Sequence, residues 1–128
     1  MKTLVLAAAL TALGTAACAD PVLGTWKTQP GDDGVYGYVE LSPCEGKVCG
    51  VLVQAFDAGG GSRSSAALGK RMVWDMVAHG GGRYGKGKIW APDRDKTYAS
   101  KMALEGDTLE VSGCVIGICR TQVWTRVP

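Results

Sequence analysis

Four of the five cysteines form two pairs with the same spacing, which suits either a bound metal or disulfide bonds. Cys44 and Cys49 make one C-x-x-x-x-C pair, and Cys114 and Cys119 make the other. Four thiolates at such spacing fit a structural zinc site. In an oxidising compartment the same pairs form disulfides instead. Each pair flanks a predicted hairpin turn, so we expect local Cys44–Cys49 and Cys114–Cys119 bridges, with pairing across the two hairpins as the alternative.

The compartment is indicated by the first nineteen residues, which have the order of parts found in a secretory signal peptide. Lys2 supplies the positive start, an apolar stretch covers residues 4–12, and Ala17-Cys18-Ala19 fits the cleavage pattern. We therefore expect a cleaved signal peptide at residues 1–19 and a mature domain at 20–128. Cleavage also removes the odd cysteine. Two alternatives remain: Cys18 as a lipid-anchored N-terminus, and a buried N-terminal helix.

Groups for acid–base or nucleophilic catalysis are sparse. His79 is the one histidine, and three glycines follow it, which is typical of an exposed loop. Asp75 interrupts an apolar strand; it points either outward to solvent or inward to a polar partner such as Arg120, where its pKa would be raised. The sequence predicts no catalytic residue, no metal site and no cofactor. The enzyme alternative uses Asp75 or Tyr98 with an arginine.

A basic segment at residues 83–101 offers a second kind of chemistry. It has six basic and two acidic side chains, with Tyr84, Trp90 and Tyr98 between them. Such a pattern can bind single-stranded nucleic acid by stacking. The preceding glycines lack the ending of a phosphate-binding loop, and the charges also fit a solvated strand face. We expect no nucleic-acid partner.

Composition limits the elements that position these residues. The 128 residues are 46% hydrophobic and 20% charged, with a net charge of +2, which fits one globular domain without strong polyanion binding. No apolar run reaches the roughly 20 residues of a membrane span. Glycine occurs 19 times, about twice its usual share, which favours tight turns in a small all-β protein.

Period-2 alternation predicts eight short strands joined mostly by hairpin-length turns. We expect a closed, antiparallel up-and-down barrel, with a two-sheet sandwich as the alternative. The glycine- and serine-rich segment 57–70 is expected to be a flexible loop, with one helical turn at 65–68 as an option. The predicted strands cover residues 24–28, 35–41, 48–56, 71–78, 84–90, 96–104, 108–114 and 120–127.

Several motifs resemble known families. Gly24-Thr25-Trp26 near the start and Trp124-Thr125-Arg126 at the end resemble the end-closing residues of the calycins, the lipocalin and streptavidin group. There an arginine of the last strand lies across a tryptophan of the first. The guanidinium would add a cation–π contact of roughly 0.5–2 kcal/mol.

A longer pattern resembles the secreted bacterial family known as domain of unknown function 2147. It is carried by segments 44–50, 87–98, 109–113 and 120–126, and its motif residues include Gly87, Ile89, Pro92, Asp93 and Tyr98. The resemblance implies export to the periplasm or outside of a bacterial cell, a lipocalin-like barrel and no established activity. The chain departs from the pattern at Asp95, where glycine is usual, and at Tyr84, where tryptophan is common. Both cysteine pairs look like a subgroup feature.

A concentration of sulfur and aromatic side chains provides the candidate binding residues. Either they fill the core, or some of them line a cavity for a small apolar or amphipathic ligand. The candidate cavity residues are Met72, Trp74, Met76, Tyr98 and Met102, with the three strand residues 72, 74 and 76 expected on one face. The alternative is an envelope or secreted interaction module with a solid core, contacting a protein through loop 57–70 or an outer strand face.

Overall fold

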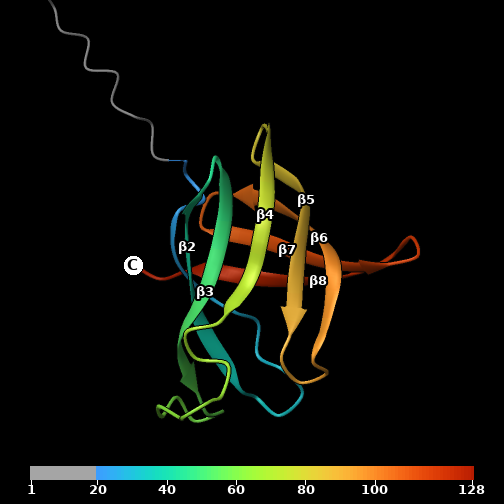
Figure 1. The fold of residues 1–128 in the computed structure, drawn as a ribbon. Coiled ribbons are helices and arrows are strands. Elements are labelled where there is room, and N and C mark those ends of the chain that lie inside the picture. The colour runs from blue at the N-terminus through green and yellow to red at the C-terminus, as the bar shows by residue number, and fades with distance from the viewer. Residues whose placement is uncertain (1–19) are drawn as a thin grey trace, which may run out of the picture.

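Alternating apolar and polar residues form eight strands, which close into one barrel (Figure 1). The computed structural model describes residues 20–128, so the predicted signal peptide and Cys18 lie outside the described residues. The strands are β1 Gly24–Lys27, β2 Tyr36–Cys44, β3 Lys47–Phe56, β4 Arg71–Gly80, β5 Arg83–Ala91, β6 Lys96–Glu105, β7 Thr108–Val115 and β8 Ile118–Arg126.

Each strand pairs antiparallel with its neighbour in sequence, and β1 closes the barrel against β8. The predicted up-and-down barrel is therefore confirmed. The closing seam is short, because it has only two residue pairs, Trp26 with Arg126 and Lys27 with Thr125. The β7–β8 pairing is longer and runs unbroken from Thr108 to the turn.

The barrel interior is built from one side of each strand. In β2, Gly37, Val39 and Leu41 are buried, whereas Glu40 between them is exposed. Several interior side chains are almost completely buried and come from strands far apart in the sequence. They are Trp26, Val39, Leu41, Val73, Met76, Leu109, Val111 and Trp124.

The alternation in β4 is broken at Asp75, which has a φ of 57°. Such a left-handed residue shifts the strand by one position, as in a β-bulge. Val73 and Met76 are consequently both buried, although they are three residues apart. The expectation that Met72, Trp74 and Met76 share one face is wrong for this reason. The Trp74 ring lies 5.3 Å from the Arg71 guanidinium.

Loop 57–70 is tied back to β3 by main-chain hydrogen bonds. Arg63 N donates to Ala55 O at 3.0 Å, and Gly69 N donates to Leu52 O at 2.8 Å. Residues 66–69 form turns rather than the helical turn that the sequence offered as an option. Ala67 is buried in the core cluster, so this loop contributes to packing.

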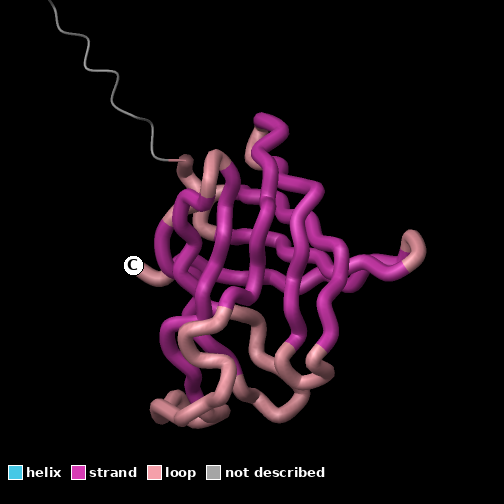
Figure 2. Tube along the Cα trace, in the orientation of Figure 1, coloured by secondary structure: helices cyan, strands magenta, loops and turns pink. Residues whose placement is uncertain are grey.

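Both local disulfides are present, Cys44–Cys49 and Cys114–Cys119. The first bridges the β2–β3 hairpin and the second the β7–β8 hairpin. The β7–β8 hairpin projects away from the barrel, whereas the other turns stay close to the two barrel ends (Figure 2). No helix within residues 20–128 is long and apolar enough to cross a membrane.

Candidate functional site

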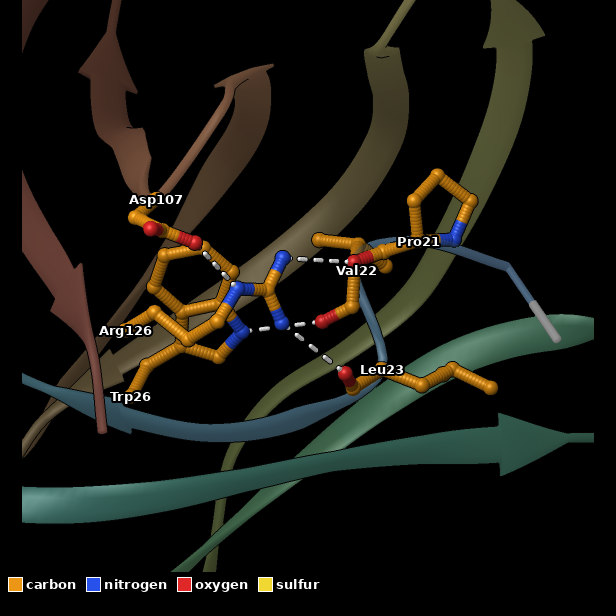
Figure 3. A network of polar contacts seen from close by, with 6 residues as sticks. All are labelled: Pro21, Val22, Leu23, Trp26, Asp107 and Arg126. Atoms are coloured by element: carbon orange, nitrogen blue, oxygen red, sulfur yellow. Dashed lines mark hydrogen bonds and ion pairs between the residues drawn. The ribbon is translucent and has the colours of Figure 1, made fainter. Parts of the chain in front are cut away.

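One end of the barrel is closed by an arginine stacked on a tryptophan (Figure 3). The Arg126 guanidinium lies 4.4 Å from the centre of the Trp26 ring. The indole N–H of Trp26 donates to Val22 O at 2.8 Å, so this fully buried ring has its polar group satisfied. Gly24, two residues before Trp26, has a φ of 123°, and a Cβ at this position would lie 3.7 Å from Arg126 Nη1.

Arg126 also holds the chain segment before β1. Its Nη2 donates to Pro21 O at 2.7 Å and its Nη1 to Leu23 O at 3.3 Å. Its Nε donates to Asp107 Oδ1 at 3.0 Å. Five N–H donors in a rigid plane allow one side chain to stack and bond in three directions at once. This constellation is structural, because its donors are used by the protein itself.

A second polar contact at this end was not found from the sequence. The Tyr84 hydroxyl donates to Asp20 Oδ1, and Val22 N donates to the same oxygen at 3.0 Å. Burial raises the pKa of the Tyr84 phenol well above its ordinary value of 10.0, and the hydrogen bond and charge of Asp20 raise it further. The only sequence signal was Tyr84 itself, where the resemblance led one to expect tryptophan.

The five candidate cavity residues do not form one wall. Met76 and Met102 are buried in the core, and Met72 packs against the core from a partly buried position. Trp74 lies against Arg71 instead of beside Met76. Tyr98 is half-buried and pairs with Ile89 across β5 and β6. The structure therefore brings together only part of this set.

Side chains occupy the space above the interior glycines. A Cβ at Gly87 would come within 2.9 Å of Met76 Cε, and one at Gly37 would come within 2.6 Å of Leu52 Cδ1. A Cβ at Gly50 would come within 2.5 Å of Leu41 Cδ2. These glycines make room for large neighbours, which fill the barrel.

At the opposite end of the barrel the inward-facing residues are less buried. Ile89 and Tyr98 are half-buried there and approach the inward-facing Gly113. Arg120 lies directly opposite Gly113 and is exposed. Because strands alternate, Arg120 shares the face of β8 that carries the buried Trp124. The Arg120 guanidinium is therefore on the same face as the half-buried Ile89 and Tyr98 side chains. We call these residues the open mouth: Ile89, Tyr98, Gly113 and Arg120.

Aromatic residues also gather on the outside of the barrel. Tyr36 stacks on Phe56 with ring centroids 5.0 Å apart, and Tyr38 lies 4.7 Å from Phe56. The ammonium of Lys27 lies 4.5 Å over the Tyr36 ring. All four side chains are partly exposed, and we call them the aromatic patch. It adjoins loop 57–70, which begins directly after Phe56.

The family-like motif residues are split between core and turn. Gly87 and Ile89 face the interior, whereas Pro92 and Asp93 lie in the exposed turn between β5 and β6. Asp95, with a φ of 47°, accepts a hydrogen bond at 2.9 Å from the indole of Trp90. This contact gives a role to a residue that the resemblance marked as a departure.

The groups considered for catalysis are dispersed. His79 and Asp75 are both exposed on β4. His79, but not Asp75, lines an outer hollow, whose basic, acidic and hydroxyl side chains include Arg83, Lys101, Glu110, Ser112 and Thr121. Ser112 and Thr121 bond each other at 2.8 Å. Within residues 20–128, no three His, Cys, Asp or Glu side chains are grouped to hold a metal.

A closed eight-stranded antiparallel barrel with an arginine over a first-strand tryptophan defines a lipocalin-like protein. Residues 24–126 match the family described as uncharacterized protein conserved in bacteria, domain of unknown function 2147, and the chain belongs to this family. Both resemblances drawn from the sequence are thereby confirmed.

A solved structure supports the fold. Protein HP1028 from Helicobacter pylori, described as belonging to the lipocalin family, is similar with a TM-score of 0.67 and 19% identity. The similarity covers 83% of this chain and 82% of that one. At this identity the likeness establishes the fold alone. No curated protein sequence matches the chain.

Proposed function

We propose that the protein is an exported, non-enzymatic barrel that recognises another protein through the aromatic patch. Export is supported by the leader-like sequence of residues 1–19 and by two disulfides, which persist in oxidising compartments. The recognition role rests on one observation: aromatic side chains that a core would normally bury are gathered on the outer face of β2 and β3.

The filled interior favours an outer surface over an inner pocket. Met76 covers Gly87 and Leu52 covers Gly37, so little room is left for a ligand at these layers. Tyrosine and phenylalanine are enriched at protein interfaces, because they bury a large area at a small cost in side-chain entropy. The ordered loop 57–70 provides a rim beside the patch.

The test is a pull-down from a bacterial envelope extract. Tyr36→Ser combined with Phe56→Ser should abolish retention of the partner that the wild-type protein captures. Lys88→Ser, on the outer face of β5, is the matched control and should retain it. Equal retention by the patch variant and the control would contradict the proposal.

The open mouth favours a second function, binding of a small amphipathic ligand. Half-buried Ile89 and Tyr98 offer apolar contacts, and the exposed Arg120 offers a cation for an anionic head group. Of the five residues predicted for such a ligand, Tyr98 lies at this end. The site is a rim rather than a deep cavity.

Titration with decanoate, followed by tryptophan fluorescence, tests this second function. Arg120→Gln should weaken binding by roughly tenfold, because one charge-assisted hydrogen bond to the carboxylate is lost. Arg83→Gln on the outer face should leave the affinity unchanged. The absence of any fluorescence change with the wild-type protein would rule the site out for fatty acids.

A further inference from the structure

Two disulfide-bridged hairpins in this barrel have the same turn backbone but opposite chemistry. The β2–β3 turn is Glu45-Gly46, with φ values of 51° and 79°. The β7–β8 turn is Ile116-Gly117, with φ values of 48° and 77°. Both turns therefore need two left-handed residues, a requirement that suits asparagine or glycine. The first turn meets it with a charged residue and the second with an exposed isoleucine.

Packing of the barrel core does not explain the exposed isoleucines of the second hairpin. Ile116 is 96% exposed and Ile118 is 75% exposed, so neither contributes to the core. A β-branched residue at positive φ is also unfavourable in itself. Glu45 and the following Lys47 show that this chain forms the same turn without apolar residues. Figure 1 shows that the β7–β8 hairpin projects from the barrel. Ile116 and Ile118 lie at its turn, and we call these two exposed side chains the apolar tip.

The strand behind this tip has an unpaired edge. β1 ends at Lys27, opposite Thr125. Within the described residues, β1 therefore has no residues that pair with the first part of β8. Continued in register, Gln29 would lie opposite Val123. Its side-chain Oε1 accepts from Val123 N at 2.8 Å, in place of a strand carbonyl. Residues 118–122 are all exposed.

The direction of the backbone groups on this edge follows from the hairpin turn. A two-residue turn closes on a hydrogen-bonded pair, here Val115 and Ile118. Hydrogen-bonded pairs alternate along the ladder, and Arg126 N donates to Asp107 O in the same series. The N–H and C=O groups of Cys119 and Thr121 therefore point away from β7, toward the open edge.

We propose that β8 binds an extended segment of another protein by antiparallel strand addition, in the direction that β1 would have continued. The free groups of Cys119 and Thr121 would bond its main chain. Aliphatic side chains of the segment would cover Ile118 and the apolar tip, and a carboxylate would lie opposite Arg120. Strand addition of this kind combines main-chain hydrogen bonds with alternating side-chain contacts.

Physical chemistry selects this occupant over two others. A bilayer would cover the isoleucines, but hydrocarbon cannot satisfy the free backbone groups of Cys119 and Thr121. A second copy, paired so that Cys119 faces Thr121, would place Arg120 directly opposite its own counterpart, and like charges in that position repel. Within residues 108–128 the only acidic side chain is Glu110, which lies in β7 opposite Val123 and away from Arg120. An acidic partner strand can bond the free backbone groups of Cys119 and Thr121 and can also place a negative charge opposite Arg120.

The site is separate from the aromatic patch, which lies on β2 and β3. The disulfide between Cys114 and Cys119 fixes the hairpin before binding, which lowers the entropy lost on association. A negative pull-down with the aromatic-patch variant would not contradict strand addition to β8. Likewise, a negative result at β8 would not contradict recognition through the aromatic patch.

Amide hydrogen exchange measured by NMR on the oxidised protein tests the proposal. In the free protein, the Cys119 and Thr121 amides should exchange much faster than those of Arg120 and Gln122, which bond β7. The probe is the end-blocked hexapeptide Thr-Val-Glu-Thr-Val-Thr at millimolar concentration. It should slow exchange of the Cys119 and Thr121 amides by roughly tenfold or more.

Variants separate the parts of the interaction. Ile116→Glu with Ile118→Lys copies the first hairpin and should remove the protection, while the unfolding midpoint stays unchanged or rises. Arg120→Glu should transfer the preference to a peptide with lysine in place of glutamate.

Three results would overturn the proposal. One is no slowing by the acidic peptide with the wild-type protein. The second is protection of the same amides by raising the protein concentration alone, which would indicate a second copy. The third is protection by phosphatidylglycerol vesicles, which would indicate a lipid surface.

Discussion

The Arg126 guanidinium lies 4.4 Å over the Trp26 ring while it bonds the main chain of Pro21 and Leu23. One residue of the last strand therefore fixes both the first strand and the segment before it. Because β1 and β8 share only two residue pairs, closure of the barrel depends on side chains at this end.

Trp26→Ala should destabilise the protein by about 3–5 kcal/mol, since it empties a fully buried site the size of an indole. Urea unfolding measures the change. Trp74→Ala is the control, because that ring is partly exposed, and it should cost much less. A loss below about 1 kcal/mol for Trp26→Ala would show that the end is held in another way.

Arg126→Lys should destabilise the protein by about 1–3 kcal/mol although the charge is kept. An ammonium cannot stack on Trp26 and bond Pro21 and Leu23 together. The matched change is Arg63→Lys in the exposed pair with Asp57, which should alter stability by about 0.5 kcal/mol or less. Equal effects of the two changes would argue that only charge matters at Arg126.

Stability should fall as the pH rises above 10.0, the ordinary pKa of the Tyr84 phenol. The folded protein holds the phenol proton more tightly than the unfolded chain, because burial and Asp20 raise its pKa. Ionisation above pH 10.0 therefore favours the unfolded chain. Tyr84→Phe should reduce this slope in unfolding curves measured across alkaline pH, and Tyr36→Phe should not. An unchanged slope in Tyr84→Phe would contradict the assignment.

Replacing both cysteines of either hairpin with serine should cost roughly 2 kcal/mol, because each bridge closes a short loop of the unfolded chain. Thermal unfolding of the two double variants provides the comparison, and the similar loop lengths predict similar losses. Peptide mapping without reduction should recover Cys44 with Cys49 and Cys114 with Cys119. Fragments joined across the two hairpins would contradict the local pairing.

Ile116→Asn should stabilise the protein by about 1 kcal/mol, since asparagine adopts the left-handed conformation of this turn more readily than a β-branched residue. The same change should weaken binding of the acidic peptide to β8, because it removes the apolar tip. Differential scanning calorimetry and peptide titration measure the two effects. Lower stability of Ile116→Asn would mean that Ile116 packs against the protein.

Much of the fold was predictable from the sequence because it depends on local patterns. Alternation predicted a strand over residues 35–41, which the structure has as β2, and the strand count led to the closed barrel. The Cys114 and Cys119 spacing indicated a local bridge, because a two-residue turn places these positions directly opposite each other. The Gly24-Thr25-Trp26 and Arg126 positions indicated the closed end.

The candidate sites were less predictable, because they depend on register and on contacts between distant segments. A left-handed Asp75 shifts β4 and separates Trp74 from Met76, and no periodicity in the sequence shows where such a shift occurs. The contact of Tyr84 with Asp20 joins residues 64 positions apart.

The sequence by itself determined the strands, the turns and the paired cysteines, since these follow from the preferences of neighbouring residues. Only the tertiary structure decided what lies inside the barrel and what remains free on its surface. β1 is four residues long and β8 is nine. The unpaired edge of β8 arises from that mismatch, because a strand can satisfy its neighbour's backbone only as far as it extends.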